Sequence, residues 1–245
     1  KHDGYRTRPF IPLTPIFMND KKYYLASAVR ELDRLAIEEH QIPGFTLMQR
    51  AGQAALTALL NRWPGTRQLL CFCGSGNNGG DGYVMAALAR AKGITATVIA
   101  VGNIHKLKGD ARLAYEMATK QGVEVIAFPI FDIEKFLKYQ GECVVVDAML
   151  GTGLSGKVTG DTLKAIELIN ATTFPVLAVD IPSGLSSDTG EIPGDAVKAE
   201  MTVTFIGRKL VQIIKEGPQT CGEIVFDDLE VPGEIFKLVT PVTRR

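Results

Sequence analysis

The residues best suited to chemistry in this sequence follow three apolar runs. Residues 74–82 combine glycines with two asparagines and an aspartate, Asp147 precedes a second glycine-rich stretch, and Asp180 precedes a turn with Ser183. Loops at the carboxyl ends of parallel strands gather at one edge of a sheet, so we expect the three segments to meet. Carboxylates beside amide and hydroxyl oxygens predict proton transfer, a bound cation, or both.

The first segment contains a G-x-G-x-x-G pattern at Gly74, Gly76 and Gly79. Such glycines let backbone amides approach a phosphate at a helix N-terminus, although a tight strand-to-helix turn explains some of them. A dinucleotide-binding dehydrogenase also needs an acid about 20 residues later. The sequence there is Val-Ile-Ala-Val-Gly-Asn over 98–103, without an acid, so we do not expect an ordinary nicotinamide dehydrogenase.

Asp147 and Asp180 each end an apolar run, which predicts that both lie at the tips of buried strands. A buried carboxylate must be paired, hydrogen-bonded or bound to a cation, because burying it alone costs several kcal/mol. Helix capping by Asp147 and turn stabilisation by Asp180 are the alternatives. Oxygen ligands without a histidine or cysteine cluster favour a hard cation over zinc, and leave the other acid for proton transfer.

The elements that must position these residues follow from apolar periodicity. We expect helices over 24–40, 46–61, 83–92, 109–121 and 161–170, and strands over 68–73, 94–101, 123–127, 143–149, 175–180, 201–206 and 223–226. Apolar strands that alternate with helices predict an α/β fold, with a mainly parallel sheet covered on both faces. We expect an N-terminal extension over 1–23, either disordered or added outside the natural start, and a single domain over 24–245.

Composition sets limits on function. The 245 residues include 27 Lys and Arg and 27 Asp and Glu, and 46% of them are hydrophobic, as in a folded globular protein. Zero formal charge argues against binding to nucleic acid, and no uncharged run approaches the roughly 20 residues that span a bilayer. The four cysteines lack metal-ligand spacing, so we expect buried thiols and a reducing compartment, the cytoplasm before an organelle.

Three motifs in this order resemble the NAD(P)H-hydrate epimerases, also called the YjeF N-terminal domain family. They are N-N-G-G-D at 77–81, V-D-A-M-L-G-T-G at 146–153 and V-D-I-P-S-G at 179–184. The resemblance runs from about 24 to 231 and includes R-A-G at 50–52 and T-V-T-F-I-G-R-K at 202–209. It implies a Rossmann-like three-layer α/β/α sandwich.

The resemblance also implies an activity and its site. Family members interconvert the R and S forms of NADHX and NADPHX, the hydrated reduced cofactors, so that a dehydratase specific for S, in trans or fused, completes the repair. It implies a potassium ion at Asn78, Asp147 and Ser183. It places substrate contacts at Asn77, Asn78, Gly79, Gly80, Asp81, Gly151, Thr152, Gly153, Leu154, Ser155, Gly156, Lys157 and Asp180.

The chemistry of such a substrate suits one carboxyl group. The hydrated carbon is a carbinolamine, so protonation of its hydroxyl and loss of water give a planar iminium that water attacks from either face. Asp180 is our candidate for giving and retaking the proton. Ring opening is the competing route, and Lys209 either contacts phosphate or is solvated.

A different class of function stays open at this point. Some relatives serve in RNA-decapping assemblies or bind apolipoprotein A-I, so the alternative is a non-catalytic scaffold or binding module of the same fold. Members that only bind are expected to lose the acids or asparagines that this sequence keeps. We expect no nucleic acid or membrane partner, and a homodimer is one assembly that the sequence leaves open.

Overall fold

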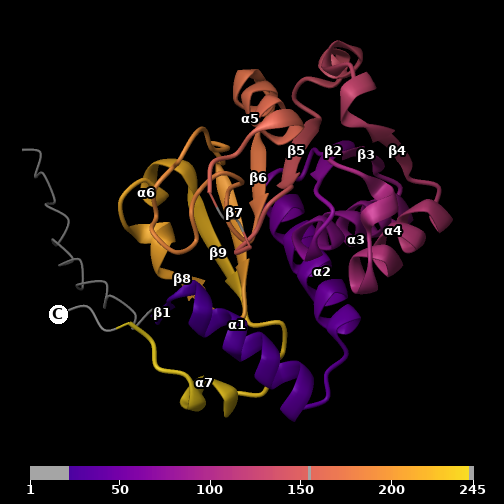
Figure 1. Cartoon of the computed structure of the whole chain (residues 1–245). Helices are drawn as coiled ribbons and strands as arrows, with labels where there is room; N and C mark the ends of the chain where they lie inside the picture. The colour runs from indigo at the N-terminus through magenta and orange to yellow at the C-terminus, as the bar shows by residue number, and fades with distance from the viewer. Residues whose placement is uncertain (1–21, 154–155, 243–245) are drawn as a thin grey trace, which may run out of the picture.

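The computed structural model describes residues 22–153 and 156–242. Its main sheet has the strand order β4-β3-β2-β5-β6-β7-β9, and each pair of neighbours is parallel (Figure 1). The strands are β2 (Gln68–Cys73), β3 (Thr95–Ala100), β4 (Glu124–Ala127), β5 (Cys143–Ala148), β6 (Val176–Val179), β7 (Met201–Phe205) and β9 (Glu223–Asp227). Each expected strand agrees with these bounds to within one residue at either end, and the last two lie at one edge of the sheet.

Side chains from the central strands enter two separate cores. In β2, Leu69 and Cys71 pack on the face covered by α1 (Ala26–Arg34), α2 (Gly44–Arg62), α3 (Asn77–Ala91) and α4 (Gly109–Lys120). Leu70 and Phe72 pack on the other face, against α5 (Gly160–Ala171). Because successive side chains of a strand point to opposite faces, these uninterrupted apolar strands bury both faces of the sheet. The Rossmann-like α/β/α sandwich is therefore confirmed.

Helix α3 begins at Asn77, six residues before the start that the sequence predicts. Glycine has a low helix propensity, so residues 77–82 were expected to form a loop. Close packing is the reason for these glycines. A Cβ atom on Gly79 would lie 2.0 Å from the carbonyl oxygen of Gly74, and one on Gly82 would lie 2.7 Å from the Cys73 sulfur. The glycines let the first turns of α3 pack directly onto the strand ends.

A second, two-stranded sheet joins β1 (Tyr23–Tyr24) to β8 (Arg208–Lys209). The sequence did not predict it, because both strands are only two residues long. Tyr23 pairs with Arg208 and Tyr24 with Lys209 in this sheet. Residues 1–21 of the expected N-terminal extension lie outside the described residues.

The remaining elements are short. Helix α1 continues into a π-helix over Leu35–Glu39, and 3-10 turns follow at Ile104–Lys106, Phe128–Ile130, Ile133–Tyr139 and Leu210–Ile213, with α6 (Gly217–Thr220) and α7 (Ile235–Leu238) near the C-terminus. All four cysteines are buried free thiols, as expected. Across the described ranges, each helix is too short or too polar to cross a membrane.

The contact between α2 and α3 gives a stability prediction. A Cβ atom on Gly52 would lie 2.6 Å from Val84 Cγ1 and 3.0 Å from the Met85 nitrogen, so Gly52→Ala must push the helices apart. Overpacking costs about 1–3 kcal/mol, while replacing glycine in a helix returns about 1 kcal/mol. We expect urea denaturation to show a net loss of about 1 kcal/mol in the free energy of unfolding.

The control is Gly65→Ala, because a Cβ atom there meets nothing within 4 Å. Its stability should stay within about 0.5 kcal/mol of the wild type. Equal stability of the Gly52 and Gly65 variants would contradict the packing described for α2 and α3.

Candidate active site

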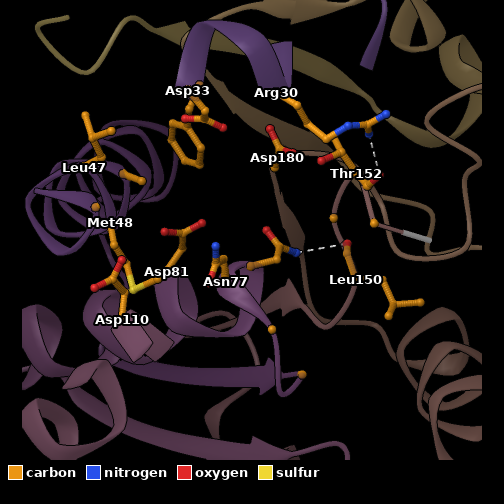
Figure 2. A pocket seen from close by; sticks show the side chains of 18 of the residues that line it. Arg30, Asp33, Leu47, Met48, Asn77, Asp81, Asp110, Leu150, Thr152 and Asp180 are labelled. Carbon is orange, nitrogen blue, oxygen red and sulfur yellow. Dashed lines mark hydrogen bonds between the residues drawn. The ribbon is translucent and has the colours of Figure 1, made fainter. Parts of the chain in front are cut away.

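A pocket of about 720 Å³ opens where β2, β5 and β6 end (Figure 2). Its volume lies within the range of about 300–1,000 Å³ that is usual for small-molecule sites. The N-terminus of α3, the segment after β5, the end of β6 and helices α1 and α2 all contribute to its walls. The predicted site residues that line it are Asn77, Asn78, Asp81, Gly151, Thr152, Gly153 and Asp180. The three segments therefore converge at one edge of the sheet, as their positions after parallel strands predict.

Other predicted substrate contacts are placed differently. Gly79 and Gly80 are buried in α3, and a Cβ atom on Gly80 would lie 2.6 Å from the Met48 sulfur, so these glycines provide close packing. Gly156 and Lys157 are not among the lining residues of the pocket. Leu154 and Ser155 lie outside the described residues.

The Asp147 carboxylate is fully buried behind the pocket and is held by Ser183. The Ser183 backbone nitrogen donates to Asp147 Oδ2 at 2.7 Å, and the Ser183 hydroxyl donates to Oδ1 at 2.6 Å. Burial raises the pKa of Asp147 to about 6, although the hydrogen bonds from Ser183 and Met149 have the opposite effect and lower this pKa. Asp147 and Ser183 thus form one buried polar unit between the ends of β5 and β6.

Asn78 joins this unit through the backbone of Leu150. Its Nδ2 donates to the Leu150 carbonyl oxygen at 3.0 Å, and the Leu150 nitrogen donates to the Ser183 hydroxyl at 2.9 Å. A carbonyl oxygen can only accept a hydrogen bond, so the Asn78 amide must direct its Nδ2, and not its Oδ1, at Leu150 O. The Asn78 Oδ1 atom therefore points away from that carbonyl. This oxygen is buried and has no hydrogen-bond partner among the described residues.

An unpartnered buried oxygen costs about 1–3 kcal/mol, so its retention indicates a missing donor or cation. Asn78, Asp147 and Ser183 all offer oxygen, the donor type preferred by hard cations. No group of three His, Cys, Asp or Glu residues suited to a metal occurs within 22–153 and 156–242. The donor set therefore consists of oxygens, which suit a hard cation better than a transition metal.

Asp180 occupies a strained backbone position at the end of β6. Its φ angle is +69°, a left-handed conformation that costs about 1–3 kcal/mol for a residue other than glycine. The Asp180 nitrogen donates to Val203 O at 2.7 Å, and Gln212 Nε2 donates to Asp180 O at 3.1 Å. These bonds hold the backbone so that the carboxylate faces the pocket (Figure 2).

Lys209 is buried and forms an ion pair with Asp180, which corrects the expectation of a solvated lysine. Only 1% of its surface is exposed. Its ammonium also donates to Thr204 Oγ1 at 2.9 Å and to Phe205 O at 3.1 Å. The short β1–β8 pairing brings Lys209 to this position, so the sequence alone did not reveal the contact.

Asp81 and Asp33 are two of the further carboxyl groups that line the same pocket. Desolvation raises the pKa of Asp81 well above its usual range, and the negative charges of Asp180 and Asp33 add to this effect. Desolvation also raises the pKa of Asp33 to about 6, with the positive charge of Lys209 acting in the opposite direction. The pocket can therefore hold a protonated carboxyl group near neutral pH.

Asp33, Arg30 and Asp110 also line the pocket and were not predicted from the sequence. A signal for Asp33 exists in the sequence. It follows Val29 by four residues and therefore lies on the apolar face of α1, where an acid is unexpected. Arg30 Nη1 donates to the Thr152 carbonyl oxygen at 3.2 Å and so connects α1 to the segment after β5.

The fold and the pocket define a Rossmann-like α/β protein with an acidic site at the carboxyl edge of its sheet. Residues 44–211 match the family described as YjeF-related protein N-terminus. This match covers more than half of the chain, and the chain belongs to the YjeF N-terminal domain family. The resemblance of the three motifs is thereby confirmed.

Curated relatives and a solved structure agree with this assignment. A Coxiella burnetii protein named bifunctional NAD(P)H-hydrate repair enzyme is 43% identical over 90% of this chain, which spans 44% of that protein. A Legionella pneumophila protein named NAD(P)H-hydrate epimerase is 35% identical over 88% of this chain, which spans 80% of it. A crystal structure of a yeast protein covers 89% of this chain and 93% of its own with a TM-score of 0.74 at 20% identity, and supports the fold.

The pairing of Lys209 with Asp180 can be tested by a double-mutant cycle. Lys209→Met leaves a largely buried carboxylate without its counterion, and Asp180→Asn leaves a buried ammonium without its own. Each single change should lower the free energy of unfolding by about 1–3 kcal/mol, and the double change by less than their sum.

Urea denaturation of the four proteins gives the coupling energy. We expect at least about 1 kcal/mol. Strict additivity of the two single changes would contradict a direct interaction between these side chains.

Proposed function

We propose that this chain is an NAD(P)H-hydrate epimerase that interconverts the R and S forms of NADHX and NADPHX. The observation that carries the proposal is the Asp180 carboxylate, held over a pocket at the carboxyl edge of a Rossmann-like sheet. The names of the Legionella and Coxiella relatives support the substrate class. The activity is an isomerisation within nicotinamide nucleotide repair.

The reaction needs little more than controlled proton transfer. Asp180 is proposed to take part in this transfer. A pocket carboxyl group gives a proton to the hydroxyl of the hydrated ring carbon, which leaves as water while the ring nitrogen forms an iminium. Water then returns to either face of the planar carbon, and its proton is taken up by a carboxylate. The Lys209 ammonium fixes the position of Asp180 and partly neutralises its charge beside the substrate.

The N-terminus of α3 suits the phosphate groups of such a substrate. Gly76 is the N-cap residue of α3, and no side chain there accepts a hydrogen bond from the first backbone amides of the helix. Gly76 and Asn77 both line the pocket. Unpaired amide groups at a helix N-terminus attract anions. We propose that this turn and the segment Gly151–Gly153 hold the nucleotide while the hydrated ring faces Asp180.

A potassium ion is proposed as the cofactor, with Asn78 Oδ1, the Asp147 carboxylate and the Ser183 hydroxyl as its protein ligands. The partnerless Asn78 oxygen supports this proposal. When bound, the ion would supply positive charge beside the nucleotide and order the segment after β5. The proton transfer itself is assigned to residues of the chain.

The proposed partner is an NAD(P)H-hydrate dehydratase, which acts on the S form that this reaction supplies. The chain spans less than half the length of the bifunctional Coxiella relative, so a fused arrangement and a separate partner are both compatible with this role. We propose a reducing, cytoplasmic setting without nucleic acid or membrane partners, with a homodimer as one proposed assembly.

The function is tested with the R form of NADHX and an S-specific dehydratase. The wild-type protein should accelerate the conversion to NADH well above the spontaneous rate. Asp180→Asn removes the carboxyl group while keeping the size of the side chain, so kcat should fall by about 10²-fold to 10⁴-fold with little change in KM. Conversion at the spontaneous rate in the presence of the wild-type protein would favour a non-catalytic scaffold. Wild-type activity in Asp180→Asn would show that another group transfers the proton.

Potassium binding is tested by thermal unfolding in potassium chloride and in tetramethylammonium chloride of equal ionic strength. Ligand binding to the folded state stabilises it by about 2.7 kcal/mol at 100 times the Kd. We expect a higher Tm in potassium for the wild type and no such difference for Asn78→Ala. Asn77→Ala is the matched control and should keep the difference, because Asn77 lines the pocket but is not one of the proposed ion ligands. Equal Tm values of the wild type in both salts would contradict the ion site.

A further inference from the structure

We propose that Asp33 on helix α1 is a second catalytic carboxyl group of this pocket, and that it exchanges the proton of the reaction with Asp180. The proposal rests on the proposed epimerase function. Asp33 and Asp180 come from different walls, α1 and the end of β6, and Figure 2 shows both side chains directed into the same space. An epimerisation that loses water from one face and regains it on the other can use one group to give the proton and a second group, on another wall, to take it.

The position of Asp33 has no structural explanation. It lies on the face of α1 that carries the buried residues Val29 and Leu32. In the parts of the chain that the structure describes, its carboxylate has no hydrogen-bond or ion-pair partner. An acid that is desolvated without a partner lowers stability, so its place on an apolar helix face points to function.

The charges around Asp33 differ from those around Asp180. Asp180 contacts the Lys209 ammonium, whereas Asp33 faces that ammonium, Asp180 and Asp81 without direct contact to any of them. Arg30, on the same helix, points away toward Thr152. Desolvation and the charge of Asp180 raise the pKa of Asp33 to about 6, which suits a proton donor near neutral pH.

The proton balance follows from these two groups. The Asp33 carboxyl gives its proton to the hydroxyl on the hydrated carbon, the carbon–oxygen bond breaks, and the ring nitrogen lone pair forms the iminium as water leaves. A water molecule adds to the other face, the iminium electrons return to nitrogen, and the Asp180 carboxylate takes the released proton. In the reverse conversion Asp180 gives the proton and Asp33 takes it. Proton exchange with solvent returns both carboxyl groups to their initial protonation states.

Asp33→Asn tests the proposal in the coupled assay with the R form of NADHX. We expect kcat to fall by about 10²-fold with KM little changed. The decline of wild-type activity above about pH 6, where Asp33 loses its proton, should disappear in the variant. Asp33→Glu keeps a carboxyl group and should restore both the decline with pH and part of the rate.

Glu31→Gln is the matched control. It makes the same change of acid to amide on the same helix, but its side chain is exposed and paired with Arg34. It should retain wild-type kinetics. Because loss of an unpartnered acid relieves a burial cost, Asp33→Asn should have a Tm equal to or above that of the wild type.

The outcomes separate the two proposals. A wild-type protein without activity overturns the epimerase function and the role of Asp33 together. An active wild type with equally active Asp33→Asn overturns the role of Asp33 alone. Loss of activity together with a lowered Tm in both Asp33→Asn and Asp33→Glu would assign a structural role to Asp33 and likewise overturn the proposal.

Discussion

The buried Asp147 carboxylate holds together the two strand ends on which the pocket is built. Its oxygens accept hydrogen bonds from the backbone and the hydroxyl of Ser183, so the end of β5 and the turn after β6 have one fixed arrangement. The parallel register places Asp147 opposite Phe72 in β2 and Ala178 in β6. This register puts the first turn of α3, the segment after β5 and Asp180 side by side.

Unequal neutralisation of the acids gives the site its chemical character. Lys209 pairs with Asp180, Ser183 binds Asp147, and Asp33 and Asp81 have only distant positive charge. Carboxyl groups in different surroundings ionise in different pH ranges, which allows an acid and a base to coexist in one pocket. Stability is the cost of this arrangement, because the desolvated acids and the left-handed backbone at Asp180 are all unfavourable in the folded state.

Strands and their functional ends were predictable, and long-range contacts were not. Apolar runs that end in Asp147 and Asp180 identify buried parallel strands and their loops, because burial on both faces leaves a simple pattern. The start of α3 was missed because glycine propensity favours a loop, whereas close packing against Gly74 and Cys73 requires glycine within the helix. The Lys209–Asp180 pair and the approach of Asp33 to Asp180 depend on segments far apart in the sequence, although the place of Asp33 on the apolar face of α1 is itself a local signal.

Removal and return of water at the hydrated carbon is the step on which the proposed mechanism depends. Its most direct test is epimerisation in water enriched in oxygen-18, with mass spectrometry of the recovered R and S forms after subtraction of spontaneous exchange. Proton transfer by the pocket carboxyl groups through an iminium predicts that every converted molecule carries solvent oxygen on the hydrated carbon. Interconversion of the two forms with the original oxygen retained would contradict this mechanism and indicate ring opening.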